Sequence, residues 1–274
     1  MLSVVFYSPY SPSPASRIII TSMAQFFASL LYNIGFFTRV LKGVGNFARR
    51  GQAAHKILVM QILFTFVEAL AIAALLAVAI GAVVTLIGSP FLAAFSQEHR
   101  IYSLLIMIIT RELGPLLAAF IIIARSATAI ATEMAGMVVS HEVEAYISVG
   151  VDPIEYLAVP RFLGVTVSLF MLNIFFSVFG LVGSFVAIQF IMPLPAAVFF
   201  GSLLENLTVP SLLVSIVKSI AFGMIISIVA ITRGLAVERA STEIPVAGLK
   251  SVGAAFVWCI VINILLSILY QMMI

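Results

Sequence analysis

The stretch that decides the fold runs from residue 162 to residue 204 and reads FLGVTVSLFMLNIFFSVFGLVGSFVAIQFIMPLPAAVFFGSLL. It contains no charged residue, and a membrane-crossing helix needs about 20 mainly apolar residues. The run is too long for one such helix, and Pro193 and Pro195 divide it. The pattern therefore predicts a membrane span over residues 162–190 and a short helix outside the bilayer at residues 194–207.

The composition of the whole chain points to the same class of protein. Of its 274 residues, 63% are apolar and 9% are charged, and the mean hydropathy is +1.23. Ordinary soluble domains carry roughly a quarter of charged residues, so these charges cannot cover a water-soluble globule. The net charge of +3 is too small to indicate a nucleic-acid partner. The single cysteine, Cys259, excludes an intrachain disulfide, and three scattered histidines predict no metal site.

Four other apolar stretches have the length of a membrane span, and Gly88, Ser89 and Pro90 are expected to end the first of them. The predicted fold is therefore an all-α polytopic membrane protein, with a flexible tail at residues 1–16 and one membrane domain at 17–274. The five predicted spans cover residues 57–87, 102–124, 162–190, 210–232 and 251–272.

Residues 17–50 have a different pattern from these spans. Phe26, Leu30 and Phe37 fall at helical spacing, polar residues lie opposite, and a basic cluster ends the stretch. An amphipathic segment of this kind is typical of a helix that lies in the headgroup region. We expect an interfacial helix here, with a short first span as the alternative.

The distribution of basic residues between the spans predicts the orientation. Only Arg100 lies on one side, between the first two spans, and every other basic residue outside the spans lies on the opposite side. The N-terminus is therefore predicted to be cytoplasmic and, with five spans, the C-terminus on the far side. The basic residues counted as cytoplasmic are Arg39, Lys42, Arg49, Arg50, Lys56, Arg125, Arg161, Arg233, Arg239 and Lys250.

The stretch between the second and third spans is the most polar in the chain. It predicts a short cytoplasmic helix at residues 140–150 that begins with Ser140 as N-cap and ends at Gly150. One face of this helix is apolar and the other acidic, which suits an element that receives force from a soluble partner; an ordinary interfacial helix is the alternative. The residues expected to contact that partner are Glu142, Val143, Glu144, Tyr146, Ile147, Asp152 and Pro153.

Several charges fall inside or next to the predicted spans, where each costs at least a few kcal/mol if it is unpaired. They are open to three readings: a proton relay, anchors for a lipid headgroup, or ion pairs that lock helices together. Counting about 100° per residue places three of them in one sector of the second span, and adjacent Arg111 and Glu112 are not expected to face each other. The lone charges of the first and fourth spans could pair with each other or with the second span. The residues concerned are Glu68, Arg111, Glu112, Arg125, Glu133 and Lys218.

The chain lacks the short motifs of ATP-binding and hydrolytic sites. It has no G-x-x-x-x-G-K-[ST] loop, no H-E-x-x-H and no G-x-S-x-G. We therefore expect no catalytic residue and no cofactor in this chain.

An ordered series of motifs strongly resembles the MlaE (YrbE-type) permeases, the membrane subunits of MCE-associated lipid ABC transporters. The resemblance covers roughly residues 25–272 and includes Gln61, Lys218-Ser219 and Gly234. Its main motifs are Arg111-Glu112-Leu113-Gly114-Pro115, Ala124-Arg125, Ala131-Thr132-Glu133-Met134, Gly150-Val151-Asp152-Pro153 and Val159-Pro160-Arg161.

The resemblance implies an N-terminal elbow helix, five spans, a coupling helix after the second span and a small periplasmic helix before the fourth. It also implies a permease dimer in the bacterial inner membrane, separate ATPase subunits that bind ATP and Mg, and a ring of MCE-domain subunits. The cargo would be phospholipid or a related lipid, moved between the inner and outer membranes. His141, Tyr146 and Ala124 depart from the usual residues, and these departures bear on specificity for one ATPase.

Two other functions are alternatives to a lipid ABC transporter permease. One is an ion-coupled secondary transporter that uses Glu68, Arg111, Glu112 and Lys218. The other is a membrane enzyme, for which the sequence offers no set of catalytic groups. A secondary transporter needs no ATPase, so recovery of an ATPase with the intact protein separates the readings.

Overall fold

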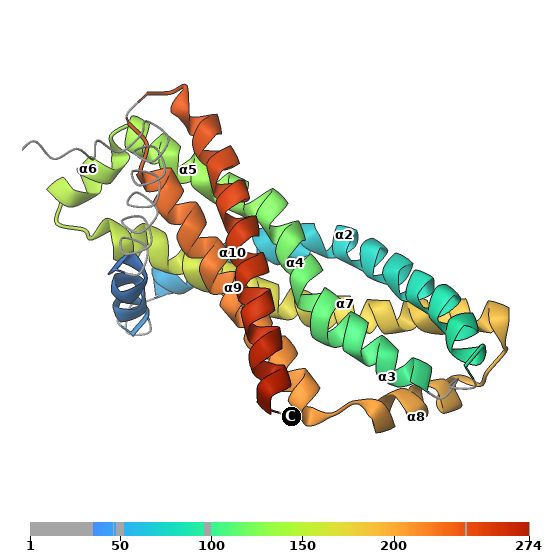
Figure 1. The fold of residues 1–274 in the computed structure, drawn as a ribbon. Coiled ribbons are helices and arrows are strands. Elements are labelled where there is room, and N and C mark those ends of the chain that lie inside the picture. Colours follow the sequence, from blue (N-terminus) through green and yellow to red (C-terminus); the bar gives the residue numbers. More distant parts are fainter. Residues whose placement is uncertain (1–34, 46, 48–51, 96–99, 239, 274) are drawn as a thin grey trace, which may run out of the picture.

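The structure is a computed structural model that describes residues 35–45, 47, 52–95, 100–238 and 240–273. The predicted tail at residues 1–16 and most of the predicted interfacial helix at 17–50 lie outside the described residues. Within that second stretch, residues 35–45 form a helix, which lies at the same end of the molecule as α6 (Glu142–Ser148) (Figure 1).

Five helical runs in the described part of the chain are long and apolar enough to cross a membrane. Four of them are built on α2 (Gln52–Ala93), α7 (Val159–Ile191), α9 (Val209–Leu235) and α10 (Glu243–Met273). The remaining run, Ile101–Val139, is here named span two. It is composed of α3 (Ile101–Leu105), the π-helical segment η2 (Ile106–Leu113), α4 (Gly114–Ile122), the π-helical segment η3 (Ile123–Ala127) and α5 (Thr128–Val139). The predicted all-α class with five spans is confirmed.

Span two is the central element of the bundle. Its successive segments contact α2, α7, α9 and α10, while α2 packs along α7, α7 along α9, and α9 along α10. α8 (Ala196–Asn206), predicted at residues 194–207, lies at the end of the bundle opposite α6. Residues 35–45 lie at the α6 end and the C-terminus at the other end (Figure 1), as five crossings require.

The first span is longer than predicted, because Pro90 does not end it. α2 continues to Ala93, and the amide of Ala94 still donates to the carbonyl of Pro90 at 3.1 Å. A proline costs a helix one backbone hydrogen bond, but here it lies in the last turn. Leu92, just beyond it, packs against a small apolar cluster that includes Ile101 and Phe199, and this contact favours the extra turn.

The second and third spans also extend beyond the predicted bounds. The predicted second span stopped before Arg125, yet the helical run continues to Val139. The third span begins at Ile154, ahead of the predicted residue 162, and starts with the π-helical segment η4 (Ile154–Ala158). Arg125 and Arg161 are therefore residues of the bundle and do not belong to a loop, since each has an acidic partner there. Removing them from the loop count leaves the predicted excess of basic residues at the α6 end unchanged in sign.

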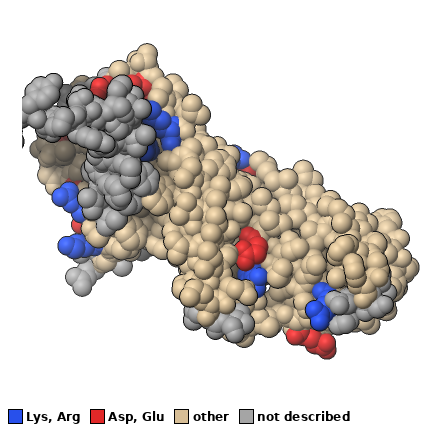
Figure 2. All heavy atoms as spheres, viewed as in Figure 1, with Lys and Arg blue, Asp and Glu red and all other residues tan. Residues whose placement is uncertain are grey.

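The surface of the bundle reflects the apolar composition. Over the face drawn in Figure 2, charged side chains gather near the α6 end and near α8, a small acidic and basic patch lies in the middle, and the rest of the surface is uncharged. Large apolar side chains stand exposed along α2, including Leu75 at 73% and Ile87 at 68%. Such a surface suits a hydrocarbon solvent, so the chain is a multi-pass membrane protein.

A stripe of small residues lets α2 approach α7 closely. Ala69, Ala73, Ala77 and Gly81 recur every fourth residue, and the three alanines are at most 1% exposed. The hydroxyl of Ser184 on α7 donates to the carbonyl of Gly81 at 3.1 Å. Close helix approach through small residues is the main source of packing energy inside a bilayer, so this stripe holds the two longest helices together.

We predict that Ala77→Leu separates α2 from α7 and lowers the stability of the purified protein. Overpacking a tight contact typically costs about 1–3 kcal/mol, and the measurement is thermal unfolding in a fixed detergent. Ala79→Leu adds the same atoms at an exposed position of the same helix and should change little. Equal effects of the two variants would contradict the assignment of the stripe.

Candidate functional site

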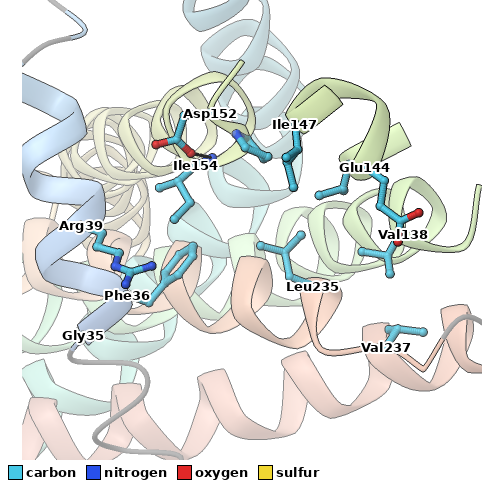
Figure 3. A pocket seen from close by; sticks show the side chains of 12 residues that line it. Gly35, Phe36, Arg39, Val138, Glu144, Ile147, Asp152, Ile154, Leu235 and Val237 are labelled. Carbon is cyan, nitrogen blue, oxygen red and sulfur yellow. Dashed lines mark hydrogen bonds between the residues drawn. The ribbon is translucent and has the colours of Figure 1, made fainter. Parts of the chain in front are cut away.

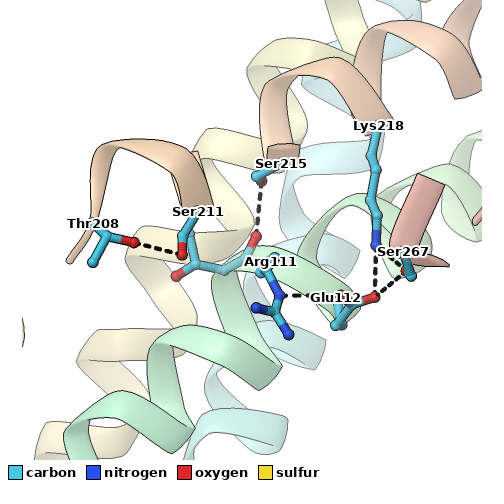
Figure 4. Close-up of polar contacts among 8 residues, drawn as sticks. Arg111, Glu112, Thr208, Ser211, Ser215, Lys218 and Ser267 are labelled. Carbon is cyan, nitrogen blue, oxygen red and sulfur yellow. Dashed lines mark hydrogen bonds and ion pairs between the residues drawn. The ribbon is translucent and has the colours of Figure 1, made fainter. Parts of the chain in front are cut away.

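Glu112 is the acidic centre of a polar junction inside the bundle. The ammonium of Lys218 on α9 lies 2.6 Å from its carboxylate, and the hydroxyl of Ser267 on α10 donates to the same oxygen at 3.0 Å. Lys218 also donates to Ser267 at 2.7 Å and is completely buried. Three helices thus meet at one carboxylate oxygen (Figure 4), and the buried lysine has its charge compensated.

Arg111 shares this junction, contrary to the expectation that it would not face its neighbour. Its Nε donates to Glu112 Oε1 at 3.2 Å, and its guanidinium lies 4.9 Å from the centre of the Tyr270 ring. The expectation was wrong because the arginine side chain is long enough to fold sideways along span two. Stacking on an aromatic face adds a cation–π contact, so Arg111 is held between Glu112 and α10.

A second ion pair joins span two to α2. Arg125 donates through Nη2 to the Glu68 carboxylate and through Nη1 to the Glu68 backbone carbonyl at 2.7 Å. Both side chains remain partly exposed, Arg125 at 38% and Glu68 at 37%. The sequence left open whether Glu68 pairs with Lys218 or with span two, and in the structure Glu68 pairs with span two.

A third ion pair joins the other end of span two to α7. Arg161 donates through Nη2 to Glu133 at 2.6 Å and through Nη1 to the carbonyl of Leu157 at 2.9 Å. Arg161 is 8% exposed. The three acid–base pairs therefore radiate from span two to α9, α2 and α7.

Arg111, Arg125 and Glu133, expected in one sector of span two, contact three different neighbours, which are α10, α2 and α7. The π-helical segments η2 and η3 interrupt the regular helix at Arg111 and at Arg125. A π-helical turn holds more residues than an α-helical turn, so angles counted at a constant step per residue drift. Gly114-Pro115 directly follows η2 and begins α4.

Two hydrogen bonds between uncharged groups lie beside the charged junction. The amide of Asn173 on α7 donates to Ser215 Oγ at 2.9 Å, and Ser215 donates to the carbonyl of Thr110 at 2.8 Å. Asn173 thus joins α7 to α9 and, through Ser215, to span two. A Cβ on Gly114 would lie 2.9 Å from Asn173 Oδ1 and 2.7 Å from the carbonyl of Ile109, so only glycine fits this contact with α7.

The short helix predicted at residues 140–150 corresponds to α6, and its start differs from the prediction. Ser140 does not cap it: its hydroxyl donates to the carbonyl of Gly136 and to Glu142. The capping position is His141, which has φ +61° and contacts Glu144 at 2.8 Å. Since a short helical turn of α5 already uses the Ser140 hydroxyl, α6 starts without a side-chain cap.

The end of α6 agrees with the prediction. Gly150 has φ +77°, and its amide donates to the carbonyl of Ile147 at 3.0 Å. The amide of Val151 reaches back to the carbonyl of Tyr146 at 2.9 Å. This pair of bonds is the Schellman arrangement, which needs a residue that tolerates positive φ.

The predicted apolar face of α6 is divided between two environments. Val143 and Tyr146 are half-buried and pack against the main apolar core, and Tyr146 lies 5.2 Å from the ring of Tyr156. Ile147 is 61% exposed, and Val149 beyond it is 73% exposed. The chain's own core therefore uses part of the face that was expected to serve a partner.

A hollow of about 580 Å³ lies between α6, the helix at residues 35–45 and the end of α9 (Figure 3). Val143, Glu144 and Ile147 line it, together with Asp152 and Pro153. Asp152 also accepts a hydrogen bond from the amide of Ile154 at 2.9 Å and so begins η4. All predicted coupling residues except Glu142 and Tyr146 thus border one hollow.

Sequence reasoning missed Ser267 and Tyr270, although a signal exists. Asn263, Ser267 and Tyr270 stand at i, i+4 and i+7 in the otherwise apolar stretch 252–270 of α10, and this spacing places them on one face. A polar stripe in a membrane span indicates contact with polar groups of a neighbour.

Among the described residues, no group of three His, Cys, Asp or Glu side chains could hold a metal ion.

We predict that Lys218→Met strongly destabilises the protein, because it leaves the Glu112 charge without its main partner. Breaking a buried ion pair on one side typically costs about 3–5 kcal/mol, and thermal unfolding in detergent measures it. Glu112→Gln together with Lys218→Met should recover part of the loss. Lys250→Met, at an exposed position, is the control, and a loss as large there would refute the role of the pair.

We predict that Gly150→Ala loosens the end of α6. A left-handed conformation costs a residue with a Cβ roughly 1–2 kcal/mol, so amide hydrogen exchange over residues 142–151 should accelerate about tenfold. His141→Gly, at the other positive φ, should relieve strain and not accelerate exchange at the start of the helix. Unchanged exchange in Gly150→Ala would contradict the cap.

Comparison with known proteins identifies the family to which this chain is similar. The family described as Permease MlaE matches residues 58–269. A probable ABC transporter permease protein of Rickettsia typhi is 30% identical over 65% of this chain and 69% of its own length. One of Synechocystis is 28% identical over 72% of each chain. The chloroplastic protein TRIGALACTOSYLDIACYLGLYCEROL 1 of Arabidopsis thaliana is 25% identical over 55% of this chain and 45% of its own length. The family match reaches into all five spans and includes α6 and the three ion pairs, and the chain belongs to the MlaE permease family.

Proposed function

We propose that this chain is the membrane-spanning, non-catalytic subunit of an ABC transporter that moves phospholipid or a related lipid between the inner and outer membranes of a bacterium. Family membership and the names of its relatives support the transporter class. The chain has no Walker A loop, so ATP and Mg would be bound and hydrolysed by a separate ATPase subunit.

A lipid cargo is supported by chemistry and by one relative. The Arabidopsis relative carries a glycolipid in its name. In this chain, an apolar hollow of about 510 Å³ opens between α2 and α4. Lipid tails require apolar area and few hydrogen bonds, which such a lining offers.

The proposed assembly contains a second permease copy, two ATPase subunits and a ring of MCE-domain proteins. The N-terminus is placed in the cytoplasm and the C-terminus in the periplasm. The excess of basic residues at the α6 end supports this orientation, and Arg39, Lys42 and Lys56 contribute to it among the described residues.

The observation that carries the proposal is the construction of α6. The helix packs against the apolar core of the chain through Val143 and Tyr146. Ile147, Val149 and the acidic Glu142 remain exposed. A helix that is anchored on one side and exposed on the other can transmit a push from a soluble partner to the spans. Closure of the ATPase would press on residues 140–153 and shift span two, with which α6 is continuous through residues 140 and 141.

The ion-coupled alternative receives less support. Glu68, Arg111, Glu112 and Lys218, which it would use, all have charged partners within the chain. A coupling ion would have to compete with those pairs. Transport that continues without an ATPase and stops when ion gradients are dissipated would favour this alternative.

We predict that Ile147→Asp abolishes recovery of the ATPase with this chain and abolishes transfer of fluorescent phospholipid between liposomes. A desolvated, unpaired charge in a docking surface costs several kcal/mol. Ile147 is a sharper test than Val143, because Val143 packs against the chain's own core.

Two variants serve as controls on the same helix. Ser148→Asp adds the same charge at a neighbouring exposed position, and Glu144→Ala removes a rim charge, which mainly tunes association rates. Both should retain the ATPase, identified by a peptide that contains its Walker A motif. If Ile147→Asp still captures the ATPase and still moves lipid, α6 is not the coupling element.

A further inference from the structure

The hollow at the α6 end borders all three segments that lead into or between the spans on that side. Phe36 lines it from the helix at residues 35–45, which precedes α2, and Ile147 lines it from α6, which lies between span two and α7. Val237 lines it from the loop that joins α9 to α10 (Figure 3). A group that enters this hollow therefore contacts the segments that precede or join all five spans.

The walls of this hollow are mainly apolar, and its charges are divided between two sides. Leu235 and Ile154 belong to the apolar lining. Arg39 lies on the helix at residues 35–45, whereas Glu144 lies on α6 and Asp152 in the segment that follows α6 (Figure 3). The hollow thus has an apolar centre with a cationic group on one side and anionic groups on the other.

The charged groups keep bonding capacity for a partner. Asp152 uses Oδ1 to accept a hydrogen bond from the amide of Ile154, and a carboxylate has a second oxygen that can accept. Arg39 forms no ion pair with a described acidic residue. Charges attract more strongly where water is displaced, so an occupant gains from a basic group at Asp152 and an acidic group at Arg39.

Neither water nor an acyl chain matches this lining. Water would wet the apolar walls, which is unfavourable, and an acyl chain offers no polar partner to the charges. A segment of a folded protein can carry a large apolar side chain between a basic and an acidic one. The volume of about 580 Å³ lies in the range of roughly 300–1,000 Å³ that encloses a drug-sized ligand, so several side chains fit.

We propose that the hollow receives a protruding segment of the ATPase subunit, with a large apolar side chain at its centre, a basic residue against Asp152 and an acidic residue against Arg39. This inference rests on the proposed function, in which the ATPase presses on α6, and α6 forms one wall of the hollow. It adds that the ATPase enters the bundle beside α6 and grips two further segments. Closure of the ATPase then moves the helix at residues 35–45 and the α9–α10 loop together with α6.

The first test measures the access of a small methanethiosulfonate reagent to the hollow in the intact complex. Val237→Cys places a thiol on the wall, Ala236→Cys places one at the neighbouring exposed position, and native Cys259 is completely buried. Bound ATPase should slow modification of Val237→Cys at least about tenfold relative to the same chain without ATPase, because anchoring side chains exclude water. Modification of Ala236→Cys should change at most about twofold.

Two results of this test would overturn the inference. Fast modification of Val237→Cys in a complex that contains the ATPase means that the hollow is open. Slow modification both with and without the ATPase means that another part of this chain or a lipid fills it.

The second test separates entry into the hollow from contact at its edge. Val237→Trp fills the hollow, whereas Ala236→Trp adds the same ring at the exposed neighbour. Val237→Trp should lower ATPase recovery about tenfold or more, since buried anchors carry most of the binding energy of an interface. Ala236→Trp should retain the ATPase, and equal losses would show contact without entry.

Charge variants test the chemistry of the inserted segment. Arg39→Glu should weaken ATPase recovery several-fold, and Lys42→Glu, on the same helix but outside the lining, should not. Asp152→Asn keeps an oxygen for the Ile154 amide and should also weaken recovery. Both losses should shrink at about 1 M salt, which screens charges, and equal effects of Arg39→Glu and Lys42→Glu would refute the charge pattern.

The wild-type chain separates this inference from the proposed function. If no protein with a Walker A peptide is recovered with it, the proposed function fails. If the ATPase is recovered and Val237→Cys stays reactive in that complex, only the insertion into the hollow is refuted.

Discussion

The structure depends on the pairing of charges on span two. An unpaired charge inside a bilayer is expensive, and three acid–base pairs on this one span bind it to α9, α2 and α7. Because each pair reaches a different neighbour, the pairs fix the rotation of span two as well as its position. The apolar packing of α2 on α7 could tolerate small slides, but a rotation of span two would expose several charges together.

Much of the fold was readable from the sequence, because long uncharged runs have few alternatives in a membrane. The differences between the expected and the observed span ends come from charged residues. The sequence places Arg125 and Arg161 outside the spans, but a charge with an acidic partner can lie inside a helix bundle. The angular count on span two could not allow for the π-helical segments η2 and η3, since no pattern in a single sequence indicates them.

The candidate site was predictable by residue type and not by partner. Glu68, Glu112 and Lys218 were conspicuous as intramembrane charges, but which helix each would contact depends on tertiary packing. Ser267 was missed because a single serine is unremarkable in an apolar span until its spacing to Tyr270 is considered. At α6, the sequence correctly predicts that Gly150 ends the helix. It does not predict the start, because the Ser140 hydroxyl, expected as the cap, donates to the carbonyl of Gly136 in the preceding helix.

The two π-helical segments have a consequence for how span two tolerates change in length. Each wide turn accommodates about one residue more than a plain α-helical turn, and one residue corresponds to about 100° of rotation. Losing a single residue within η2 would therefore close the wide turn to an α-helical one, and Arg125 and Glu133 would still face Glu68 and Arg161. A loss within α4 has no wide turn to absorb it, so the helix beyond would rotate by about 100° and Arg125 would turn away from Glu68. Span two thus tolerates a change of one residue at its π-helical segments and transmits it as rotation elsewhere.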